Sequence, residues 1–296
     1  MAPRVAFQGE PGAFSEEAVL RFFGSADGAT AVPTWRAVFE ALDGREADFG
    51  VVAIESSLAG TIRETYDLLF EYHDRVRIVG EVTVPVRLAL VALPGRAIDD
   101  IERVYSHPQA LAQADEFLRG RPWTVLTTYN TAGAAKVIAA ERDAGAAAVA
   151  SPRVADIYGL TVLAADIQTG SDNRTRFAVL ARADAAADAR LEAADAWAAG
   201  PAAGGPTGQP MKTTLVFAVR NAPGSLHACL GAFASRGVNL SRLESRPSRA
   251  ARWEYVFWVD LDADATDTVC AAALDELRGV AAMVRVLGSY PRPSEE

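Results

Sequence analysis

The hydrophobic positions of this chain recur with two periods, one typical of buried strands and one typical of helices. Residues 4–8 and 48–54 are short and mostly apolar, as in strands covered on both faces. Between them Thr34, a residue suited to cap a helix, precedes a helical repeat of apolar residues at Trp35, Val38, Phe39 and Leu42. Strand and helix patterns therefore alternate, which predicts an α/β protein.

The alternation continues through the first 181 residues. Further strands are predicted at 76–84, 87–93, 104–106, 124–126 and 147–150. Helices are predicted up to Phe23, around Ile62, Tyr66, Leu69 and Phe70, from Gln109 and from Thr131. A further short helix is predicted after Ser151, its N-cap, with Pro152 at the first helical position. Because a helical pattern separates most of the strands, we expect largely parallel sheets.

A change in composition separates this region from the last third of the chain. Residues 183–210 are mostly Ala, Asp, Gly and Pro, which predicts a linker at about 182–211. Beyond it the pattern has the order βαββαβ, the ferredoxin-like arrangement, over 212–296. The strands are expected at 213–219, 239–245, 254–261 and 282–287, and the helices at 225–235 and 266–277.

Composition narrows the functional classes. The 296 residues suffice for two or three folding units, and no apolar run approaches the roughly 20 residues of a membrane span. A net charge of −9 disfavours nucleic acid and anionic membrane as partners. Cys229 and Cys270 are expected as buried reduced thiols, and with only three scattered histidines we expect no metal. The chain enters a strand-like segment directly after its first residues, so we do not expect a secretory signal. We therefore expect a cytoplasmic enzyme.

Three predicted strand-to-helix junctions are rich in small residues: Gly12 to Ser15, Ser56 to Gly60 and Asn130 to Gly133. A helix N-terminus offers unpaired N–H groups and partial positive charge, so junctions that converge on one cleft would bind an anionic ligand. Ordinary N-capping is the alternative explanation for each of them. Glu16 and Glu17 follow the first junction, where they suit the helix dipole but would repel a carboxylate.

Six short motifs occur in a fixed order along the chain. They are Gly9-Glu10-Pro11-Gly12-Ala13-Phe14-Ser15, Ser106-His107-Pro108-Gln109-Ala110-Leu111, Thr131-Ala132-Gly133-Ala134-Ala135-Lys136, Tyr158-Gly159-Leu160, Thr175-Arg176-Phe177 and Glu244-Ser245-Arg246-Pro247. Together they resemble the prephenate dehydratase family in its bacterial two-domain form, which carries a C-terminal ACT regulatory domain. The resemblance covers about residues 4–290 except the linker.

The resemblance implies a catalytic domain at 1–181 with two lobes, as in periplasmic binding proteins. Lobe one would comprise about 1–80 and 160–181, lobe two about 81–159, with a hinge around Pro85 and the substrate in the cleft. The implied reaction is the decarboxylating dehydration of prephenate to phenylpyruvate in L-phenylalanine biosynthesis, without metal or redox cofactor. The ACT domain at 212–296 would bind L-phenylalanine as an allosteric effector in a homodimer or homotetramer.

The resemblance also implies site residues. Thr175 of the family signature would be catalytic, as a hydrogen-bond donor to the leaving hydroxyl. The implied substrate-binding residues are Ala13, Phe14, Glu55, Ser56, Ser57, Thr131, Ala132, Gly133, Asn173, Arg176 and Phe177. The implied effector-binding residues are Asn221, Ala222, Pro223, Gly224, Ser225, Leu226, Glu244, Ser245 and Arg246. Four residues also have an alternative interpretation in which they have no part in binding or catalysis. Arg176 would form an inter-strand pair, Phe177 would belong to the core, Arg246 would pair with Glu244, and His107 would be a turn element and not a general acid.

One motif departs from the family. The chain has Ala53-Ile54-Glu55-Ser56-Ser57 where the family usually has Pro-Ile-Glu-Asn-Ser. Ser56 keeps the capping ability of the usual Asn but not its amide. Two alternative functions therefore stay open: an arogenate dehydratase, and a non-catalytic ligand-binding homologue. The presence of Thr175 speaks against the second, because a pure receptor has no need of a donor to a leaving group.

Overall fold

The computed structural model of the chain describes residues 2–170, 172–186, 188–189, 210–247 and 255–293. Two compact units are distinguished within the chain. The first consists of Met1–Thr65 and Val82–Phe177, the second of Tyr66–Glu81 and Ala178–Glu296. Most of the predicted linker lies outside the described residues.

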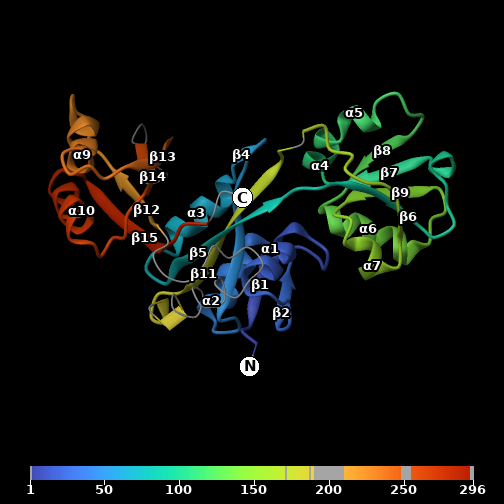
Figure 1. Ribbon diagram of the computed structural model, residues 1–296, viewed down its shortest axis with the longest axis horizontal. Coiled ribbons are helices and arrows are strands. Elements are labelled where there is room, and N and C mark those ends of the chain that lie inside the picture. Colours follow the sequence, from blue (N-terminus) through green and yellow to red (C-terminus); the bar gives the residue numbers. More distant parts are fainter. Residues whose placement is uncertain (1, 171, 187, 190–209, 248–254, 294–296) are drawn as a thin grey trace. The chain divides into compact units, whose positions relative to one another are not determined.

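Lobe one contains a sheet of order β2-β1-β3-β11-β5, with β4 paired to β3 (Figure 1). Its strands are β1 (Val5–Gln8), β2 (Ala29–Val32), β3 (Phe49–Ser56), β4 (Gly60–Thr61), β5 (Val76–Pro85) and β11 (Arg174–Arg182). Helices α1 (Phe14–Phe23), α2 (Trp35–Asp43) and α3 (Arg63–Glu71) connect them. β1 runs parallel to both β2 and β3.

Local sequence accounts for how α2 packs. The Thr34 hydroxyl accepts a hydrogen bond from the Ala37 N–H (3.1 Å), so the predicted N-cap is confirmed. The predicted apolar face of the helix is buried, with Val38 fully covered. Gly50 of β3 allows the close approach, because a Cβ there would lie 2.7 Å from the Val38 Cγ1.

Lobe two contains a second sheet, of order β10-β6-β9-β7-β8. β7 runs parallel to β8 and β9, whereas β6 is antiparallel to β9 and β10, so the predicted parallel arrangement holds for part of the sheet. The strands are β6 (Ala89–Ala92), β7 (Arg103–Ser106), β8 (Thr124–Thr127), β9 (Ala146–Ala150) and β10 (Thr161–Ala164). The turn η1 (Ile98–Asp100) precedes β7.

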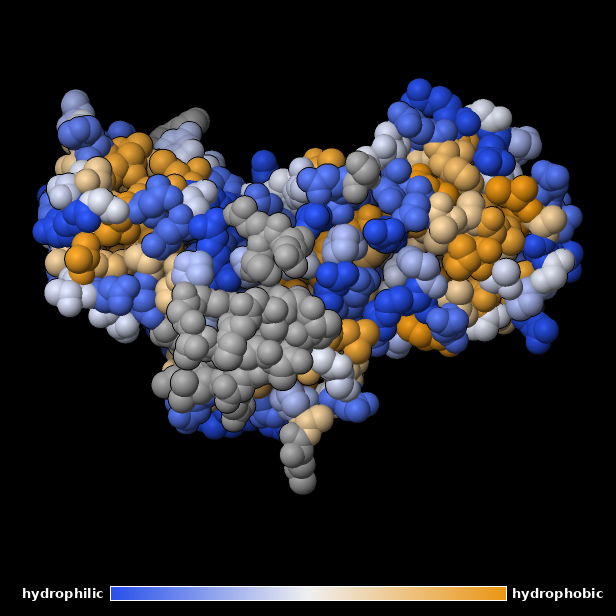
Figure 2. Space-filling model, in the orientation of Figure 1, coloured by the Kyte–Doolittle hydropathy of each residue, from blue (hydrophilic) through white to orange (hydrophobic). Residues whose placement is uncertain are grey.

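Helices cover both faces of the lobe two sheet. Figure 1 shows α4 (Pro108–Gln113) and α5 (Asp115–Leu118) on one face and α6 (Thr131–Glu141) and α7 (Val154–Tyr158) on the other. Each face has its own buried cluster, and both clusters contain alanines of the central strand β9. Figure 2 shows hydrophobic and hydrophilic residues mixed on the surface in view, which is ordinary for a globular protein.

The structure corrects three sequence-based predictions. Strand β10 was not predicted, and because it pairs with β6, lobe two extends to Ala164 and not to 159. It also begins after Pro85, where β5 ends, and not at 81. The last helix of lobe two begins at Val154, because Ser151 uses its hydroxyl to accept from the Arg153 N–H (3.3 Å) in a preceding turn.

The chain crosses between the two sheets twice, and the two crossings lie side by side. The Val86 N–H donates to the Asn173 carbonyl (2.7 Å), and the Ile167 N–H donates to the Leu88 carbonyl (2.9 Å). Pro85 stands at the first crossing, as predicted. The strands that carry the site thus meet where the lobes are joined.

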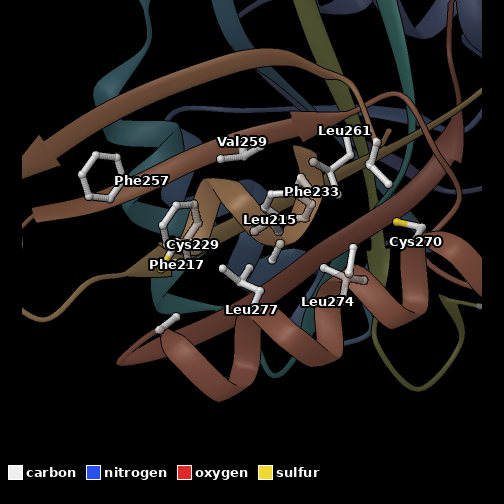
Figure 3. Packing of buried hydrophobic residues seen from close by; sticks show 14 residues of the cluster. Leu215, Phe217, Cys229, Phe233, Phe257, Val259, Leu261, Cys270, Leu274 and Leu277 are labelled. Atoms are coloured by element: carbon white, nitrogen blue, oxygen red, sulfur yellow. The ribbon is translucent and has the colours of Figure 1, made fainter. Parts of the chain in front are cut away.

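The second unit contains the predicted βαββαβ order. Its elements are β12 (Met211–Ala218), α9 (Ser225–Ala234), β13 (Leu240–Pro247), β14 (Tyr255–Leu261), α10 (Thr268–Val280) and β15 (Met283–Pro291), with sheet order β13-β14-β12-β15. Figure 3 shows side chains of the sheet and both helices, among them Phe217 and Leu274, directed toward one another in the core. Cys229 and Cys270 are free and buried, as predicted.

Alternate residues of this sheet lie on its other face, which packs against the catalytic-region segments of the same unit. Trp258 stacks edge-on against Tyr66 of α3, with ring centroids 4.6 Å apart. The Lys212 ammonium lies 3.0 Å from a carboxylate oxygen of Glu81 in β5, and both side chains are buried. The Tyr290 hydroxyl donates to the same carboxylate (3.2 Å). A paired charge is therefore buried inside the second unit.

Candidate active site

A cavity of about 360 Å³ is lined by residues of both lobes. The side chains described around it include no Lys, Arg, Asp or Glu. They are Gln8, Ala13, Phe14, Ser15, Trp35, Ala53, Ser56, Ile62, His107, Gln109, Tyr129, Asn130, Thr131, Thr175 and Phe177. Six of the twelve residues implied as catalytic or substrate-binding are in this set: Ala13, Phe14, Ser56, Thr131, Thr175 and Phe177.

The first junction places Ala13 and Phe14 in the cavity lining. Gly12 has φ +89°, and a Cβ there would lie 2.7 Å from the Val154 Cγ1, so the loop is pressed against α7. The Glu16 carboxylate accepts from the Gly12 N–H (2.9 Å) and pairs with Arg153 (2.9 Å). The expected repulsion of an anion by Glu16 is therefore reduced by Arg153 of lobe two.

The junction before α6 is held by Asn130. Its Oδ1 accepts from the Gly133 N–H (3.1 Å), so Asn130 is the N-cap. Thr131 lines the cavity, whereas Ala132 and Gly133 are buried beside it without lining it. A Cβ at Gly133 would lie 2.6 Å from the Tyr129 ring, so glycine there makes room for this cavity residue.

The Glu10 carboxylate of lobe one connects the first junction to the junction before α6. The Tyr129 hydroxyl donates to the Glu10 carboxylate (3.0 Å), and the Lys136 ammonium lies 2.9 Å from its other oxygen. Burial, and then the neighbouring Glu10 carboxylate, raise the pKa of Tyr129. Tyr129 is therefore neutral at pH 7 and donates its proton in a hydrogen bond to Glu10.

The signature strand β11 brings Thr175 and Phe177 into the cavity. Side chains alternate along a strand, so Arg176 lies on the other face. There its guanidinium lies 2.5 Å from the Glu55 carboxylate of β3, and neither residue lines the cavity. The alternative of an inter-strand pair for Arg176 is thus the observed one. The Thr175 hydroxyl makes no hydrogen bond with the part of the chain that the structure describes.

The second junction is a hairpin and not a helix start, which corrects the sequence-based prediction. β3 turns into β4 at Ser56, and α3 begins only at Arg63. The Ser56 hydroxyl accepts from the Leu58 and Ala59 N–H groups (3.4 and 3.3 Å) while Ser56 lines the cavity. A two-residue strand such as β4 leaves no periodic pattern in the sequence, so the hairpin was missed.

Ser57 and Asn173 support the signature strand instead of lining the cavity. The Ser57 hydroxyl accepts from the Arg174 N–H (3.0 Å), and the Ser57 N–H donates to the Arg174 carbonyl (2.9 Å). Asn173 is only 2% exposed, and neither atom of its amide has a hydrogen-bond partner among the residues described. Ser57 therefore fixes where β11 begins, and the Asn173 backbone carbonyl, which accepts from the Val86 N–H, holds the residue before it.

Several lining residues were not predicted as site residues, and His107 is the most informative. It follows β7 and caps α4 through its ring, whose Nδ1 accepts from the Gln109 N–H (3.2 Å). Burial lowers the pKa of His107. The motif Ser106 to Gln109 had been recognised, but a His-Pro turn gave no signal that the ring also lines a cavity. Gln8, the last residue of β1, and Trp35, the first residue of α2, were also missed, because nothing in the local sequence marks them as cavity residues.

The second unit holds another cavity, of about 350 Å³. It is lined by Asn221, Ala222, Ser225, Leu226 and Ser245 from the predicted effector set and also by Val219, Arg220, Tyr255 and Phe257. Pro223 and Gly224 do not line it, although Gly224 with φ +83° allows the turn into α9. Arg220, which was not predicted, makes no ion pair within the described residues.

Two predicted effector residues, Glu244 and Arg246, do not face this cavity. They alternate with Ser245 along β13 and therefore lie on its other face. Glu244 pairs with Arg242 (2.5 Å), and Arg246 lies 3.4 Å from Asp67. The suggested pairing of Arg246 with Glu244 is not the one observed.

The described residues contain no cluster of three or more His, Cys, Asp or Glu side chains placed to hold a metal ion. No helix among those residues has the length and hydropathy needed to cross a membrane. The side chains described in the lining of the first cavity offer hydroxyl, amide, indole, phenol and imidazole groups.

Comparisons with known proteins agree with this geometry. A family model described as prephenate dehydratase matches residues 5–185, and one described as ACT domain matches residues 213–278. Arogenate dehydratase 2 of Petunia hybrida is 40% identical over 305 residues, which cover 98% of this chain and 72% of that protein.

Two solved structures are similar over nearly the whole chain. Prephenate dehydratase from Arthrobacter aurescens in complex with L-Phe is 34% identical, with a TM-score of 0.80, and the match covers 98% of this chain and 91% of that one. A protein described as GqqA, a novel type of quorum quenching acylase, is 32% identical, also with a TM-score of 0.80 and with 98% of both chains covered. The match to the family model over more than half of its length shows that the chain belongs to the prephenate dehydratase family and carries a C-terminal ACT domain.

Proposed function

We propose that the chain converts prephenate to phenylpyruvate, carbon dioxide and water in the cavity between its two lobes. The observation that carries this proposal is the position of Thr175. In a chain of this family, the signature hydroxyl lines an uncharged cavity and has no hydrogen-bond partner within the described residues. It is thus available to a substrate oxygen.

The reaction breaks two bonds of the substrate ring. The bond from the ring to its carboxylate breaks, carbon dioxide leaves, and the electron pair enters the ring as the bond to the hydroxyl breaks. The departing hydroxide takes up one proton and leaves as water. Thr175 is too weak an acid to supply a full proton on its own, so its role is to donate a hydrogen bond to the leaving oxygen as charge develops there.

Neutral donors hold the anionic substrate. The N-cap of α1, Ala13, has no side-chain cap, which leaves N–H groups of the first turn available beside the cavity. The start of α6 offers the N–H groups of its first turn that precede Gly133, whose N–H Asn130 already caps, and Thr131 is in the lining. Phe177 and Phe14 supply apolar surface for the ring that becomes aromatic.

The cavity lining favours prephenate over arogenate. Arogenate carries an amine in place of the keto group, and a bound ammonium calls for an acidic or carbonyl partner. None of the side chains described in the lining is acidic, so only neutral oxygens, such as the amide oxygens of Gln8 and Gln109, could take this role. The similarity to the Petunia arogenate dehydratase nevertheless makes arogenate the substrate to compare.

The proposed catalytic domain is 1–181, and the proposed ACT domain is 212–296. The second cavity, in the ACT domain, is proposed as the regulatory site. The match to an ACT domain and the Arthrobacter prephenate dehydratase complex with L-Phe support L-phenylalanine as an inhibitor that binds there. Arg220 is the proposed partner of its carboxylate. We further propose a cytoplasmic homodimer or homotetramer, in which the partner's ACT domain completes the effector site beside Ser245.

The test is turnover of the purified protein on prephenate and arogenate side by side, each with and without L-phenylalanine. We expect faster turnover of prephenate and its suppression by L-phenylalanine. Faster turnover of arogenate would overturn the substrate assignment. Absence of turnover on either substrate by a folded protein would overturn the enzymatic function in favour of a ligand-binding homologue.

A further inference from the structure

His107 has a fixed orientation in the first cavity. It follows the last residue of β7 in an extended conformation (φ −66°, ψ 142°) and is the N-cap of α4. Pro108 at the first helical position has no N–H to satisfy. The first N–H that needs an acceptor is therefore that of Gln109, and it donates to His107 Nδ1 (3.2 Å).

This hydrogen bond determines the tautomer of the ring. Because Nδ1 accepts, it carries no proton, and the single proton of the neutral imidazole lies on Nε2. Burial lowers the pKa of His107, which keeps the ring neutral at pH 7. The Nε2–H has no acceptor among the residues that the structure describes. His107 therefore presents an unused donor in the cavity lining.

An anionic ligand in this cavity needs such donors. The described lining has no Lys or Arg side chain. The Tyr129 hydroxyl already donates to Glu10, and the Gln8 Nε2 donates to the Pro33 carbonyl (3.5 Å). Thr175 supplies a hydroxyl from lobe one, and His107 supplies an N–H from lobe two.

The reaction indicates which of the two substrate carboxylates His107 contacts. A hydrogen bond to the ring carboxylate would stabilise the group that must leave as carbon dioxide, and would raise the barrier. A hydrogen bond to the side-chain carboxylate is kept from substrate to product and has no such effect. We propose that His107 Nε2–H binds this retained carboxylate, so that the histidine caps α4 and holds the substrate at once. This inference rests on the proposed function.

Two substitutions separate the two roles of the ring. His107→Asn places an oxygen near the position of Nδ1, which keeps the cap, and removes the Nε2–H. His107→Gln places an amide nitrogen near the position of Nε2 and weakens the cap. Loss of a hydrogen bond to a charged group predicts a KM for prephenate about ten- to a hundredfold higher in His107→Asn, with kcat nearly unchanged. His107→Gln is expected to keep a larger share of the affinity and to unfold at lower temperature.

The opposite result would overturn the inference. If His107→Asn matched the wild type while His107→Gln lost affinity, the ring would act only as a cap, and the proposed function would stand. Calorimetric titration with phenylpyruvate, which retains the carboxylate, gives a readout without turnover. Equal phenylpyruvate affinity of the wild type and His107→Asn would also overturn the inference, whereas failure of the wild type to convert either substrate would overturn the proposed function itself.

Discussion

The two cavities of this molecule have nearly the same volume, about 360 and 350 Å³, but differ in charge. The cavity between the lobes has only neutral side chains in its described lining, although its proposed ligand is a dianion. The cavity of the ACT domain includes Arg220, which is exposed to solvent. A guanidinium that stays hydrated costs little when no ligand is bound, so an exposed arginine can serve a site in the ligand-free protein. The comparison teaches that two cavities of similar size can use different donors, neutral groups in one and an exposed cation in the other.

The cost of an unpaired charge is decisive at Lys212 and Glu81, whose side chains are both buried. Here the charge is tolerated because it is permanently paired. Lys212→Met leaves the buried carboxylates of Glu81 and Asp260 with one ammonium fewer, and we expect the free energy of unfolding to fall by about 3–5 kcal/mol. Urea denaturation measures this loss as a lower midpoint.

A double variant is the matched control for that loss. Lys212→Met with Glu81→Gln removes both charges, and most of the stability should return because an amide needs no cation. Arg4→Met breaks the exposed Arg4–Asp48 pair and should leave the midpoint unchanged. Equal midpoints for the single variant and the wild type would mean that pairing does not explain why this charge is tolerated.

The next effect in size concerns the neutral cavity. Thr175→Ala removes one donor to the leaving oxygen, and we expect kcat on prephenate to fall by about 10²–10³. Affinity for L-phenylalanine at the other cavity should not change. Thr175→Ser keeps a hydroxyl and should retain a much larger share of kcat. Steady-state kinetics that showed a raised KM with normal kcat would assign Thr175 to binding and not to the chemical step.

Sequence predicted the elements better than it predicted the sides on which residues lie. All six elements of the ACT domain were predicted with ends shifted by a few residues, because each has a clear period. The strands β2, β4 and β10, of two to four residues each, were missed, since segments this short carry almost no periodic signal. Of the signature triplet, Thr175 and Phe177 line the cavity and Arg176 does not, because a motif read along the chain does not state which face each side chain takes.

The charged cavity gives a smaller prediction. Arg220→Gln removes the guanidinium proposed to bind the carboxylate of L-phenylalanine. Because Arg220 is exposed, we expect only about a tenfold rise in the concentration of L-phenylalanine that halves the activity, near the lower limit for a hydrogen bond to a charged group. Arg278→Gln, at an exposed arginine paired with Asp275 of α10, is the control and should not shift the inhibition curve. If inhibition were unchanged in Arg220→Gln, the guanidinium would not bind the carboxylate of L-phenylalanine. Neither cavity would then have a charged side chain in contact with its ligand.

The smallest expected effect is at Ser56, where the neutral cavity departs from its family. The Ser56 hydroxyl accepts from two N–H groups of the hairpin at 3.3 and 3.4 Å, so it caps the turn. Ser56→Asn can keep this cap through its carbonyl oxygen and adds two amide donors to the lining. One additional hydrogen bond predicts a rise in kcat/KM for prephenate of about two- to tenfold.

Ser56→Ala is the control for that change, because it removes the cap without adding a donor. If only the cap mattered, Ser56→Asn would equal the wild type and Ser56→Ala alone would lose stability. A fall in kcat/KM for Ser56→Asn would show that the neighbouring lining has adapted to the smaller side chain. A rise in kcat/KM for prephenate together with a fall for arogenate would show that a neutral donor sets the substrate preference of this cavity. The exposed Arg220 of the other cavity would instead discriminate between ligands by charge.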